Sequence, residues 1–468
     1  MEKYRVIKFG GSGLSSASDL QQITRVLKFY QPPVIIVLSA FNGVTDQLEK
    51  VLSHSTNIYR EGIKLIKHLR EMKSNIIDSV FQESKVKNEV KNALENRLEK
   101  LDKSLLASQC IGEVPDFLRD DILSYGERLS SLIVSGYLKE QGLKVNELLP
   151  EDIPLLTDGV YGNATVDYEL CSLSVNDKLE GQSFVIPGFY GVSKKGKKTL
   201  LGRGGSDYSA ASVAKCVNAA SLDVWKDVNG FLSADPRLID NVRDIKHLSY
   251  DEASEIAYFG SEILHPRTVE PLRATKIPVR VYNIRDYNCW PEPQTLINQE
   301  KKISAEIIKS ISYSDSLALI TLSGAGVGIK GGVLAQITRI LDQYGINIKS
   351  VLTSQIAINL LIDHEVIKKA VELLKDADIK SVENISVSED ISVIAAVGEG
   401  LIHFDGLASG IFTAVARKKI NVEMICFGAS SVAVYFVVKS TNRLETVKAL
   451  HDYYFSAEKH LTATQKTY

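Results

Sequence analysis

The sequence has few cysteines and lacks any arrangement of them that indicates a disulfide framework or a structural zinc site. Its five cysteines form no CxxC pair and have no histidine at metal-ligand spacing; they are Cys110, Cys171, Cys216, Cys289 and Cys426. Scattered thiols of this kind argue against a secreted disulfide scaffold and against a zinc finger. Reduced thiols in a cytoplasm fit the pattern best.

The sequence also lacks a membrane-spanning run and a secretory leader. No apolar stretch reaches the roughly 20 residues that a helix needs to cross a bilayer. A strand pattern begins at Tyr4 and leaves no room for a signal peptide. We therefore expect a cytoplasmic protein that does not bind membranes.

An excess of charge of one sign is absent as well. Lysine and arginine total 55, aspartate and glutamate total 57, and the formal net charge of −2 is spread without long blocks. This balance indicates no nucleic-acid partner, although small local anion sites remain possible. Hydrophobic residues make up 44% of the 468 residues, which is typical of a globular protein and, at roughly 150 residues per domain, suggests about three units.

What the sequence does contain is, first, the pattern of an α/β sheet. Residues 4–9 alternate as a strand, Gly10 and Gly11 break it, and residues 17–30 carry apolar side chains at helical spacing. Residues 34–38 are continuously apolar, as in a parallel strand covered on both faces. Ligands of open α/β sheets bind beyond the carboxyl ends of the strands, so we expect a site at the two glycines and at residues 39–45.

A glycine-rich turn at residues 201–211 has the chemistry of an anion site. Its sequence LGRGGSDYSAA places Arg203, Ser206 and Asp207 among glycines, directly before a helix-forming run. Backbone N–H groups and the positive end of the helix dipole converge at such a turn. Arg203 can form two hydrogen bonds to a carboxylate or phosphate, and Asp207 can orient a lysine or a metal. Taken alone, the stretch fits a tight turn with solvated charges about equally well.

Other segments suggest how the chain is divided. Residues 56–107 are helical and highly charged, which predicts a surface helical insertion. A second helix is predicted over residues 122–138, and Gly126 within it costs stability and invites a functional reason. Residues 278–282 look like the closing strand of this domain, and the proline-bearing residues 286–312 are predicted to be a linker.

An internal repeat follows residue 310. The segment around Asn347 matches the segment around Asn421, and each copy reads strand, glycine turn, amphipathic helix, strand, strand. Paired units of this kind resemble ACT modules, which sense small molecules in many biosynthetic enzymes. Two ferredoxin-like domains used only for assembly are the alternative.

Several short motifs occur in one order along the chain. They are KFGG at 8–11, SYGE at 124–127, GRGGSDY at 202–208, WKDV at 225–228, DPR at 235–237, and FG at 259–260 followed by LHP at 264–266. With the two repeats, this ordered set resembles an aspartate kinase over essentially the whole chain. The end near Glu458 resembles the monofunctional type, and residues 424–431 are similar to the lysine-sensitive branch.

The resemblance implies a fold and a division into domains. The fold is the α/β amino-acid-kinase fold, an αβα sandwich with a mainly parallel sheet, followed by two α+β ferredoxin-like ACT domains. The catalytic domain would cover residues 1–285, the linker 286–312, and the ACT domains 313–388 and 389–458.

The resemblance also implies a reaction. ATP, with Mg²⁺, would phosphorylate the side-chain carboxylate of L-aspartate to 4-phospho-L-aspartate, the first step of lysine, threonine and methionine biosynthesis. A carboxylate is already ionised near neutral pH, so catalysis reduces to positioning and charge stabilisation. Lys8 would neutralise the transferring phosphoryl group, and Asp207 would orient Lys8 and keep it charged by raising its pKa.

Binding residues follow from the same resemblance. Arg203 would hold the α-carboxylate of aspartate and Glu127 its α-ammonium. The other positions of that pocket would be Ser39, Ala40, Thr45, Phe189 and Ser206. The nucleotide side would consist of Gly10, Gly11, Lys226, Asp227, Leu232, Arg237 and Glu262.

The nucleotide side departs from the family pattern at residues 12–14, where Ser-Gly-Leu replaces the usual Thr-Ser-Val and one hydroxyl near the phosphates is lost, and in three further residues. Glu262 replaces a lysine and reverses the charge next to a polyanion. Lys226 stands where a threonine is common, and it is the candidate for restoring that positive charge. Leu232 replaces a tyrosine expected near the adenosine.

The effector region departs too. Positions matching the lysine site of the family, at the ACT–ACT interface, are Val327, Lys330, Ile348, Lys349, Ser354 and Gln355. Lys349 stands where an acidic residue is usual, and together with Lys330 it would repel the side chain of lysine. We therefore expect lysine inhibition to be weak, absent or replaced by another effector. ACT units commonly pair between chains, so a homodimer or higher homo-oligomer is expected.

Two other functions are left open by the sequence. A different enzyme of this fold could act on glutamate, acetylglutamate or a nucleotide, but residues 124–127 and the ACT pair argue against it. A non-catalytic amino-acid sensor is the other alternative, yet such a protein has no chemical reason to keep Lys8, Glu127, Arg203 and Asp207.

Overall fold

The computed structural model describes residues 3–53, 57–179, 181–260, 263–286 and 290–456. Glu262, one of the predicted nucleotide residues, therefore lies outside the described residues. The chain forms two compact units. The first consists of residues 1–231, 244–257 and 262–300, and the second of residues 232–243, 258–261 and 301–468.

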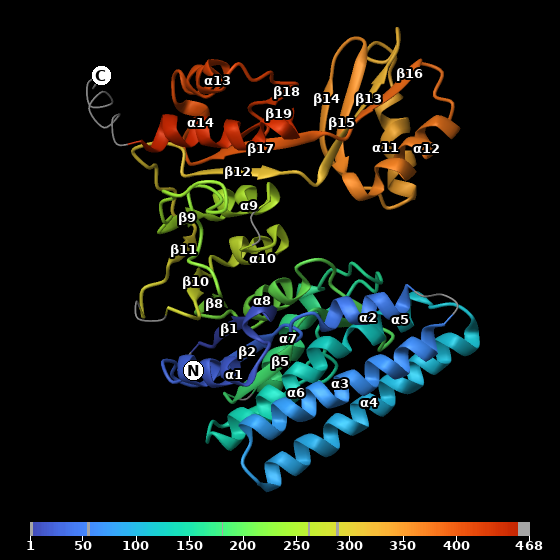
Figure 1. The fold of residues 1–468 in the computed structure, drawn as a ribbon, viewed down its shortest axis with the longest axis vertical. Coiled ribbons are helices and arrows are strands. Elements are labelled where there is room, and N and C mark those ends of the chain that lie inside the picture. The colour runs from blue at the N-terminus through green and yellow to red at the C-terminus, as the bar shows by residue number, and fades with distance from the viewer. Residues whose placement is uncertain (1–2, 54–56, 180, 261–262, 287–289, 457–468) are drawn as a thin grey trace. The chain divides into compact units, whose positions relative to one another are not determined.

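An eight-stranded sheet forms the centre of the first unit, with the order β3-β5-β2-β1-β8-β10-β11-β9 (Figure 1). All neighbouring strands run parallel except β10 and β11. The strands are β1 (Arg5–Phe9), β2 (Val34–Leu38), β3 (Val145–Glu147), β5 (Ser183–Pro187), β8 (Ser221–Lys226), β9 (His247–Ser249), β10 (Val279–Asn283) and β11 (Thr295–Asn298). Every residue of β2 and β5 is buried, which explains their continuous apolar sequence.

Helices and a small sheet complete this unit and confirm the predicted α/β fold. The helices are α1 (Ala17–Leu27), α2 (Val44–Leu52), α3 (Ile58–Val80), α4 (Lys85–Ile111), α5 (Asp116–Leu123), α6 (Tyr125–Glu140), α7 (Tyr168–Leu179), α8 (Gly205–Cys216), α9 (Tyr250–Tyr258) and α10 (Pro266–Thr275). The small sheet contains β4 (Leu156–Thr157), β6 (Tyr190–Ser193) and β7 (Lys198–Leu200). Within the part of the chain that the structure describes, every helix is too short or too polar to traverse a bilayer.

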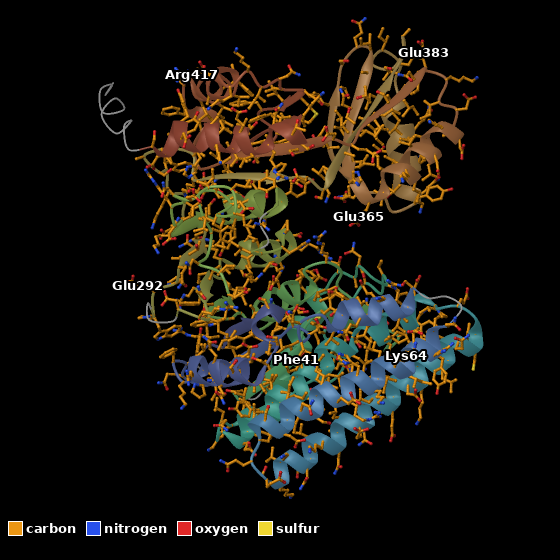
Figure 2. All side chains as sticks on the ribbon, viewed as in Figure 1. Phe41, Lys64, Glu292, Glu365, Glu383 and Arg417 are labelled. Atoms are coloured by element: carbon orange, nitrogen blue, oxygen red, sulfur yellow. The ribbon has the colours of Figure 1, made fainter. Side chains whose placement is uncertain are left out.

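The charged helical segment is a hairpin of α3 and α4, which lie side by side (Figure 1). Leu69 and Leu101 are fully buried in it, whereas Lys64 faces solvent (Figure 2). Gly62 allows close packing, because a Cβ there would lie 2.8 Å from a methyl carbon of Leu105. The stripe of apolar residues therefore serves to pack the two helices together and onto the main core.

Two local predictions differ from the structure. The helix predicted over 122–138 is two helices, because Ser124 ends α5 and its hydroxyl donates to the carbonyl of Asp121 at 2.6 Å. The sheet does not close at β10, because β11 follows within the segment predicted to be a linker. The hydroxyl of Thr295 anchors β11 by accepting from the N–H of Phe231 and donating to the carbonyl of Ile245.

Two four-stranded antiparallel sheets, each with two helices, form most of the second unit. The first contains β13 (Leu317–Ser323), β14 (Ile348–Thr353), β15 (Ala357–Asp363) and β16 (Asn384–Ser388), with α11 (Val333–Gln343) and α12 (Ile367–Asp376). The second contains β12 (Ser310–Ser314), β17 (Ile391–Val397), β18 (Met424–Cys426) and β19 (Ala433–Lys439), with α13 (Leu407–Arg417) and α14 (Arg443–Phe455). The starts of α11 and α13 are separated by the same interval as Asn347 and Asn421, which confirms the repeat.

Candidate active site

A cavity of about 340 Å³ lies in the first unit, at the carboxyl ends of β1 and β2 and at the start of α8. All nine residues predicted to act in catalysis or aspartate binding line it: Lys8, Ser39, Ala40, Thr45, Glu127, Phe189, Arg203, Ser206 and Asp207. They come from widely separated parts of the first unit's sequence. The parallel sheet brings them together because its strands end at one edge.

Two lysines surround the carboxylate of Asp207 in this cavity. Lys8 is 4% exposed and forms an ion pair with Oδ1 of Asp207, while Nζ of Lys226 lies 3.4 Å from Oδ2. Burial alone would raise the pKa of Asp207, but Lys226 and Lys8 outweigh it and lower that pKa to about 2. Asp207 is therefore a carboxylate at neutral pH, shared between two ammonium groups.

The predicted rise in the pKa of Lys8 is wrong in its net direction. Burial removes water from the ammonium group and lowers its pKa below the ordinary lysine value. Asp207 opposes this shift, and the positive charge of Lys226 adds to it. Asp207 thus favours the charged form of Lys8, as expected, but burial outweighs its effect.

Glu127 lies in the first turn of α6 and is 3% exposed. Its Oε1 accepts from the hydroxyl of Ser206 at 3.2 Å, and its Oε2 has no hydrogen-bond partner among the described residues. Burial raises the pKa of Glu127 to about 8, against the opposing hydrogen bonds from the Ala40 backbone and Ser206. The positive charge of Lys8 also favours the ionised form, but burial outweighs it, so this carboxyl group is mostly protonated at neutral pH.

Gly126 explains how Glu127 comes so close to the loop after β2. A Cβ at position 126 would lie 2.9 Å from the Cβ of Ala40 and 3.2 Å from Oγ1 of Thr45. The helix could not approach the loop this closely with a larger residue. The glycine that is unfavourable for α6 thus permits a contact within the site.

Arg203 is exposed at the tip of the glycine-rich turn and lines the cavity. Gly202 and Gly204 on either side have φ angles of 76° and 70°, in the left-handed region that favours glycine. Among the described residues, the Arg203 side chain has no hydrogen-bond or ion-pair partner. Its guanidinium is therefore available for an anion from outside the protein.

Phe189 forms a strained wall of the same cavity. Its φ angle of 73° is rare for a residue with a side chain and costs on the order of 1–3 kcal/mol. The turn that contains it packs tightly on α8, since a Cβ on Gly188 would lie 2.9 Å from the Cβ of Ser206. The strain is therefore maintained by contacts at the start of the anion-binding turn.

The cavity has other lining residues to which the sequence analysis gave no individual role: Ser12, Phe41, Asn42, Gly43 and Asp46, with the turn glycines 202, 204 and 205. Phe41, labelled in Figure 2, carries the ammonium group of Lys73 over its ring at 3.5 Å from the centroid. Residues 41–43 lie in the loop that was expected to face a ligand, and the cavity includes them as the strand-end rule predicted, whereas Asp46 gave no signal.

Four of the predicted nucleotide residues that the structure describes lie in the first unit. Gly10 sits between the two lysines, because a Cβ there would lie 3.6 Å from Nζ of Lys8 and 3.8 Å from Cγ of Lys226. Gly11 lines the cavity itself. The carboxylate of Asp227 accepts from the hydroxyl of Ser12 at 2.8 Å, which joins the end of β8 to the turn after β1.

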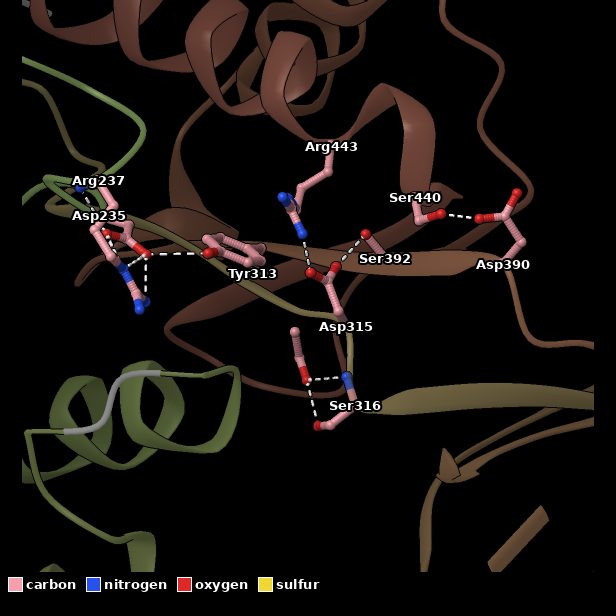
Figure 3. A network of polar contacts seen from close by, with 10 residues as sticks. Asp235, Arg237, Tyr313, Asp315, Ser316, Asp390, Ser392, Ser440 and Arg443 are labelled. Atoms are coloured by element: carbon pink, nitrogen blue, oxygen red, sulfur yellow. Dashed lines mark hydrogen bonds and ion pairs between the residues drawn. The ribbon is translucent and has the colours of Figure 1, made fainter. Parts of the chain in front are cut away.

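Leu232 and Arg237, by contrast, belong to the second unit. The side chain of Arg237 is 71% exposed and pairs with Asp235 at 2.8 Å between Nη2 and Oδ2. Asp235 in turn accepts a hydrogen bond from the hydroxyl of Tyr313 at 3.0 Å (Figure 3). The carbonyl of Leu232 accepts from Ser310 at 3.0 Å. Both predicted nucleotide residues are thus tied to β12.

The predicted effector residues lie in and around the first antiparallel sheet. Val327 is buried, and the next residue, Gly328, packs on the β14–β15 turn that holds Ser354 and Gln355, donating to the Gln355 carbonyl at 3.1 Å. Ile348 is half-buried on β14, and Lys330 is exposed.

Lys349 also lies on β14 and has partners that the sequence did not reveal. Its ammonium group lies 3.5 Å from Oδ2 of Asp363 and 5.3 Å from the ring centroid of Tyr258. The hydroxyl of Tyr258 donates to the carbonyl of Lys349 at 3.1 Å. The positive charge expected to repel lysine is therefore partly balanced within the protein.

Comparison with known proteins identifies the family. The model of the amino acid kinase family matches residues 3–283, and an ACT domain model matches residues 320–377 and 394–454. The chain is 30% identical to chloroplastic aspartokinase 1 of Arabidopsis thaliana, over 97% of this chain and 80% of that protein. It is 26% identical to lysine-sensitive aspartokinase 3 of Escherichia coli, over 97% of this chain and 100% of that protein.

A solved structure is similar over its whole length. The crystal structure of E. coli aspartokinase III in complex with aspartate and ADP superposes with a TM-score of 0.83 at 25% identity, covering 97% of this chain and 100% of that one. The chain therefore belongs to the amino acid kinase family and, within it, to the aspartokinases that carry C-terminal ACT domains. It spans 57% of the bifunctional aspartokinase/homoserine dehydrogenase of Buchnera aphidicola, to which it is 28% identical.

Proposed function

We propose that the cavity in the first unit binds L-aspartate and that ATP phosphorylates its side-chain carboxylate there, giving 4-phospho-L-aspartate. The observation that carries the proposal is the composition of the cavity. Its walls contain an arginine and a buried carboxyl oxygen that have no partner in the described parts of the chain, and a buried lysine–aspartate pair. These three features match the α-carboxylate, the α-ammonium and the reacting end of an amino acid with an acidic side chain.

Arg203 and Glu127 would hold the amino-acid end of the substrate. A guanidinium binds a carboxylate through two parallel hydrogen bonds, and Arg203 has this capacity unused. The ammonium of aspartate would stabilise the ionised form of Glu127, whose pKa of about 8 otherwise keeps it protonated. Binding of aspartate at neutral pH would therefore release a proton from Glu127.

Lys8 and Lys226 would stabilise the phosphoryl group during transfer. The attacking carboxylate is already ionised, so the site needs positive charge and N–H donors and no general base. Lys8 supplies charge from the end of β1, and Asp207 holds its ammonium group in place. The backbone of Gly10 and Gly11 would approach the phosphates, and Lys226 would add a second cation beside them.

The donor set suits Mg²⁺ that enters with ATP. Among the described residues, no three His, Cys, Asp or Glu side chains are arranged to hold a metal ion. Mg²⁺ in phosphoryl-transfer sites keeps several waters and binds one or two carboxylates together with the substrate phosphates. Asp227, whose Oδ1 accepts from the hydroxyl of Ser12 in the turn after β1, would contribute a carboxylate. When bound, the ion would neutralise phosphate charge.

Trapping the product tests this function directly. The protein is incubated with ATP, Mg²⁺ and hydroxylamine, which converts an acyl phosphate to its hydroxamate, and L-glutamate replaces L-aspartate in the control. We expect ATP-dependent hydroxamate with aspartate and none with glutamate. Binding of aspartate without any turnover would instead support the sensor function.

Regulation by an amino acid through the ACT domains belongs to the same proposal. Lys349 would disfavour a bound lysine, although its pairing with Asp363 reduces the repulsion. We expect lysine to inhibit weakly or not at all, and a titration showing inhibition at millimolar concentration or below would contradict this. Threonine is assayed in parallel.

We also propose a homodimer or higher homo-oligomer in the cytoplasm. β14 is an edge strand of its sheet, and Val351 and Leu352 on it are each 39% exposed. An exposed apolar edge strand readily pairs with another chain. The four cysteines that the structure describes form no disulfide with one another, which fits a reducing compartment. Sedimentation as a monomer at micromolar concentration would contradict the assembly.

A further inference from the structure

Arg267, the second residue of α10, makes a set of contacts unusual for a partly exposed side chain. Its Nη1 donates to the carbonyl of Leu201 and to Oδ1 of Asn163, both at 2.7 Å. Its Nη2 donates to the carbonyl of Ala164 at 2.8 Å and to Oγ1 of Thr165 at 3.4 Å. One guanidinium thus joins two loops that are distant in sequence.

These contacts reach the turn that carries Arg203 from its N-terminal side. Leu201 is the first residue of the turn, and Asn163 packs on Gly202, where a Cβ would lie 2.6 Å from the Asn163 side-chain oxygen. The guanidinium of Arg267 also lies over the ring of Tyr208, 4.4 Å from its centroid, in the first turns of α8. Arg267 therefore contacts residues on both sides of Arg203.

His265 completes this arrangement from the same helix end. A Cβ on Gly204 would lie 2.3 Å from the Cβ of His265, so the imidazole-bearing residue packs directly on the turn. Nδ1 of His265 accepts the N–H of Arg267 at 3.4 Å and caps α10. The start of α10 thus holds Gly204 as well as Leu201.

We propose that Arg267 is a positioning residue for the amino-acid substrate, acting through Arg203. The inference rests on the proposed function of the cavity. Arg203 is exposed and, among the described residues, unpaired, so only its backbone turn fixes where its guanidinium can meet a carboxylate. Arg267 fixes that turn by donating a hydrogen bond to the carbonyl of Leu201, two residues before Arg203. A lysine has one donor centre in place of the planar fork and cannot satisfy all four oxygens.

Steady-state kinetics of Arg267→Ala and Arg267→Lys test the proposal, with Arg273→Ala as the matched control. Arg273 lies on the same helix and pairs with Asp251 at 2.6 Å. Misplacing a binding group by about 1 Å can cost up to 100-fold, so we expect the KM for aspartate to rise about 10- to 30-fold in Arg267→Ala. The KM for ATP and kcat should change by less than about twofold, as for loss of uniform substrate binding.

The other variants sharpen the result. The KM for aspartate of Arg267→Lys should lie between those of wild type and Arg267→Ala. Arg273→Ala should keep the wild-type KM for aspartate. In an Arg203→Met background, Arg267→Ala should add little, because its effect passes through the missing side chain. Additive effects, or equal changes in both KM values, would show a general structural role and overturn the proposal.

Failure of this inference is distinguishable from failure of the proposed function. A wild-type protein that does not phosphorylate aspartate would overturn both. Normal wild-type turnover together with an unchanged KM for aspartate in Arg267→Ala would overturn the positioning role alone. Thermal unfolding of each variant shows whether a kinetic change comes with loss of the fold.

Discussion

The residues assigned to aspartate and those assigned to the nucleotide are distributed differently in this structure. Every residue assigned to the aspartate side lies in the first unit and lines one cavity. Of the nucleotide side, Gly10, Gly11, Lys226 and Asp227 lie in that unit, whereas Leu232 and Arg237 belong to the second. The difference teaches that the residues assigned to aspartate share a single sheet edge, whereas the described residues assigned to the nucleotide are divided between the two units.

Two short segments show this division most clearly. Residues 232–243 and 258–261 fall inside the span matched by the amino acid kinase family, yet they belong to the second unit. Ser233 hydrogen-bonds His451 at 2.9 Å, and the ring of Phe259 lies 4.8 Å from that of Tyr435. These segments therefore contact α14 and β19 of the second antiparallel sheet and its helices.

The largest expected effect comes from Lys8, which is assigned to the phosphoryl group as it passes from ATP to aspartate. Lys8→Met removes the buried cation at the point of phosphoryl transfer, and losing one such group typically lowers kcat about 100- to 1,000-fold. The hydroxamate assay measures the loss, and Lys28→Met, at an exposed lysine, is the control. Activity within a factor of three of wild type would remove Lys8 from the mechanism.

A variant of Lys226 distinguishes nucleotide binding from aspartate binding, because Lys226 is assigned to the nucleotide alone. Lys226→Met should raise the KM for ATP about tenfold, an effect equivalent to roughly 1.4 kcal/mol, and leave the KM for aspartate unchanged. Lys226→Arg should keep most of the nucleotide affinity, because it keeps the positive charge. Unchanged ATP affinity in Lys226→Met would contradict its assignment as a second cation.

The pH dependence of aspartate binding tests Glu127. Its pKa is raised to about 8, so the ionised form that binds an ammonium increases as pH rises. If only the ionised form binds, the KM for aspartate should fall roughly eightfold between pH 7 and 8.5. The KM for ATP should not show this pH dependence. Glu127→Gln should abolish the pH dependence of the KM for aspartate. A KM for aspartate that rises over this range would give the opposite sign and reject the assignment.

The smallest expected effect lies on the side shared with the second unit. Tyr313→Phe removes the hydrogen bond to Asp235, the partner of Arg237, at a cost of about 1 kcal/mol. We expect the KM for ATP to rise about two- to threefold, with the KM for aspartate unchanged. Tyr344→Phe, at an exposed tyrosine, is the control. The reverse pattern, a change confined to aspartate, would break the distinction between the two sides.

The sequence predicted what depends on strand order and missed what depends on packing between distant segments. β2 was predicted at Val34–Leu38, as observed, because a buried parallel strand is a continuous apolar run. β11 was missed because four residues, held by the hydroxyl of Thr295, carry no such pattern. The predicted pKa direction of Lys8 failed because burial of a polar residue in a strand is not visible in the sequence.

The regulatory half shows the same limit. Repetition of the sequence at a constant interval predicted two equivalent modules, and the helices α11 and α13 confirm it. The partner of Lys349, Asp363, lies on the neighbouring strand, and strand register cannot be read from charge alone. The domain boundaries and the roles of the individual site residues stay predictions.

The most direct test of the account is equilibrium binding of L-aspartate in the absence of ATP, measured by calorimetry with wild type and with Arg203→Met. Arg203 is the one charged group assigned to the aspartate side alone whose side chain is unpaired among the described residues. We predict that wild type binds aspartate and that Arg203→Met binds it at least tenfold more weakly while keeping its affinity for ATP. Equal aspartate affinity in the two proteins would contradict the claim that this cavity is the aspartate site.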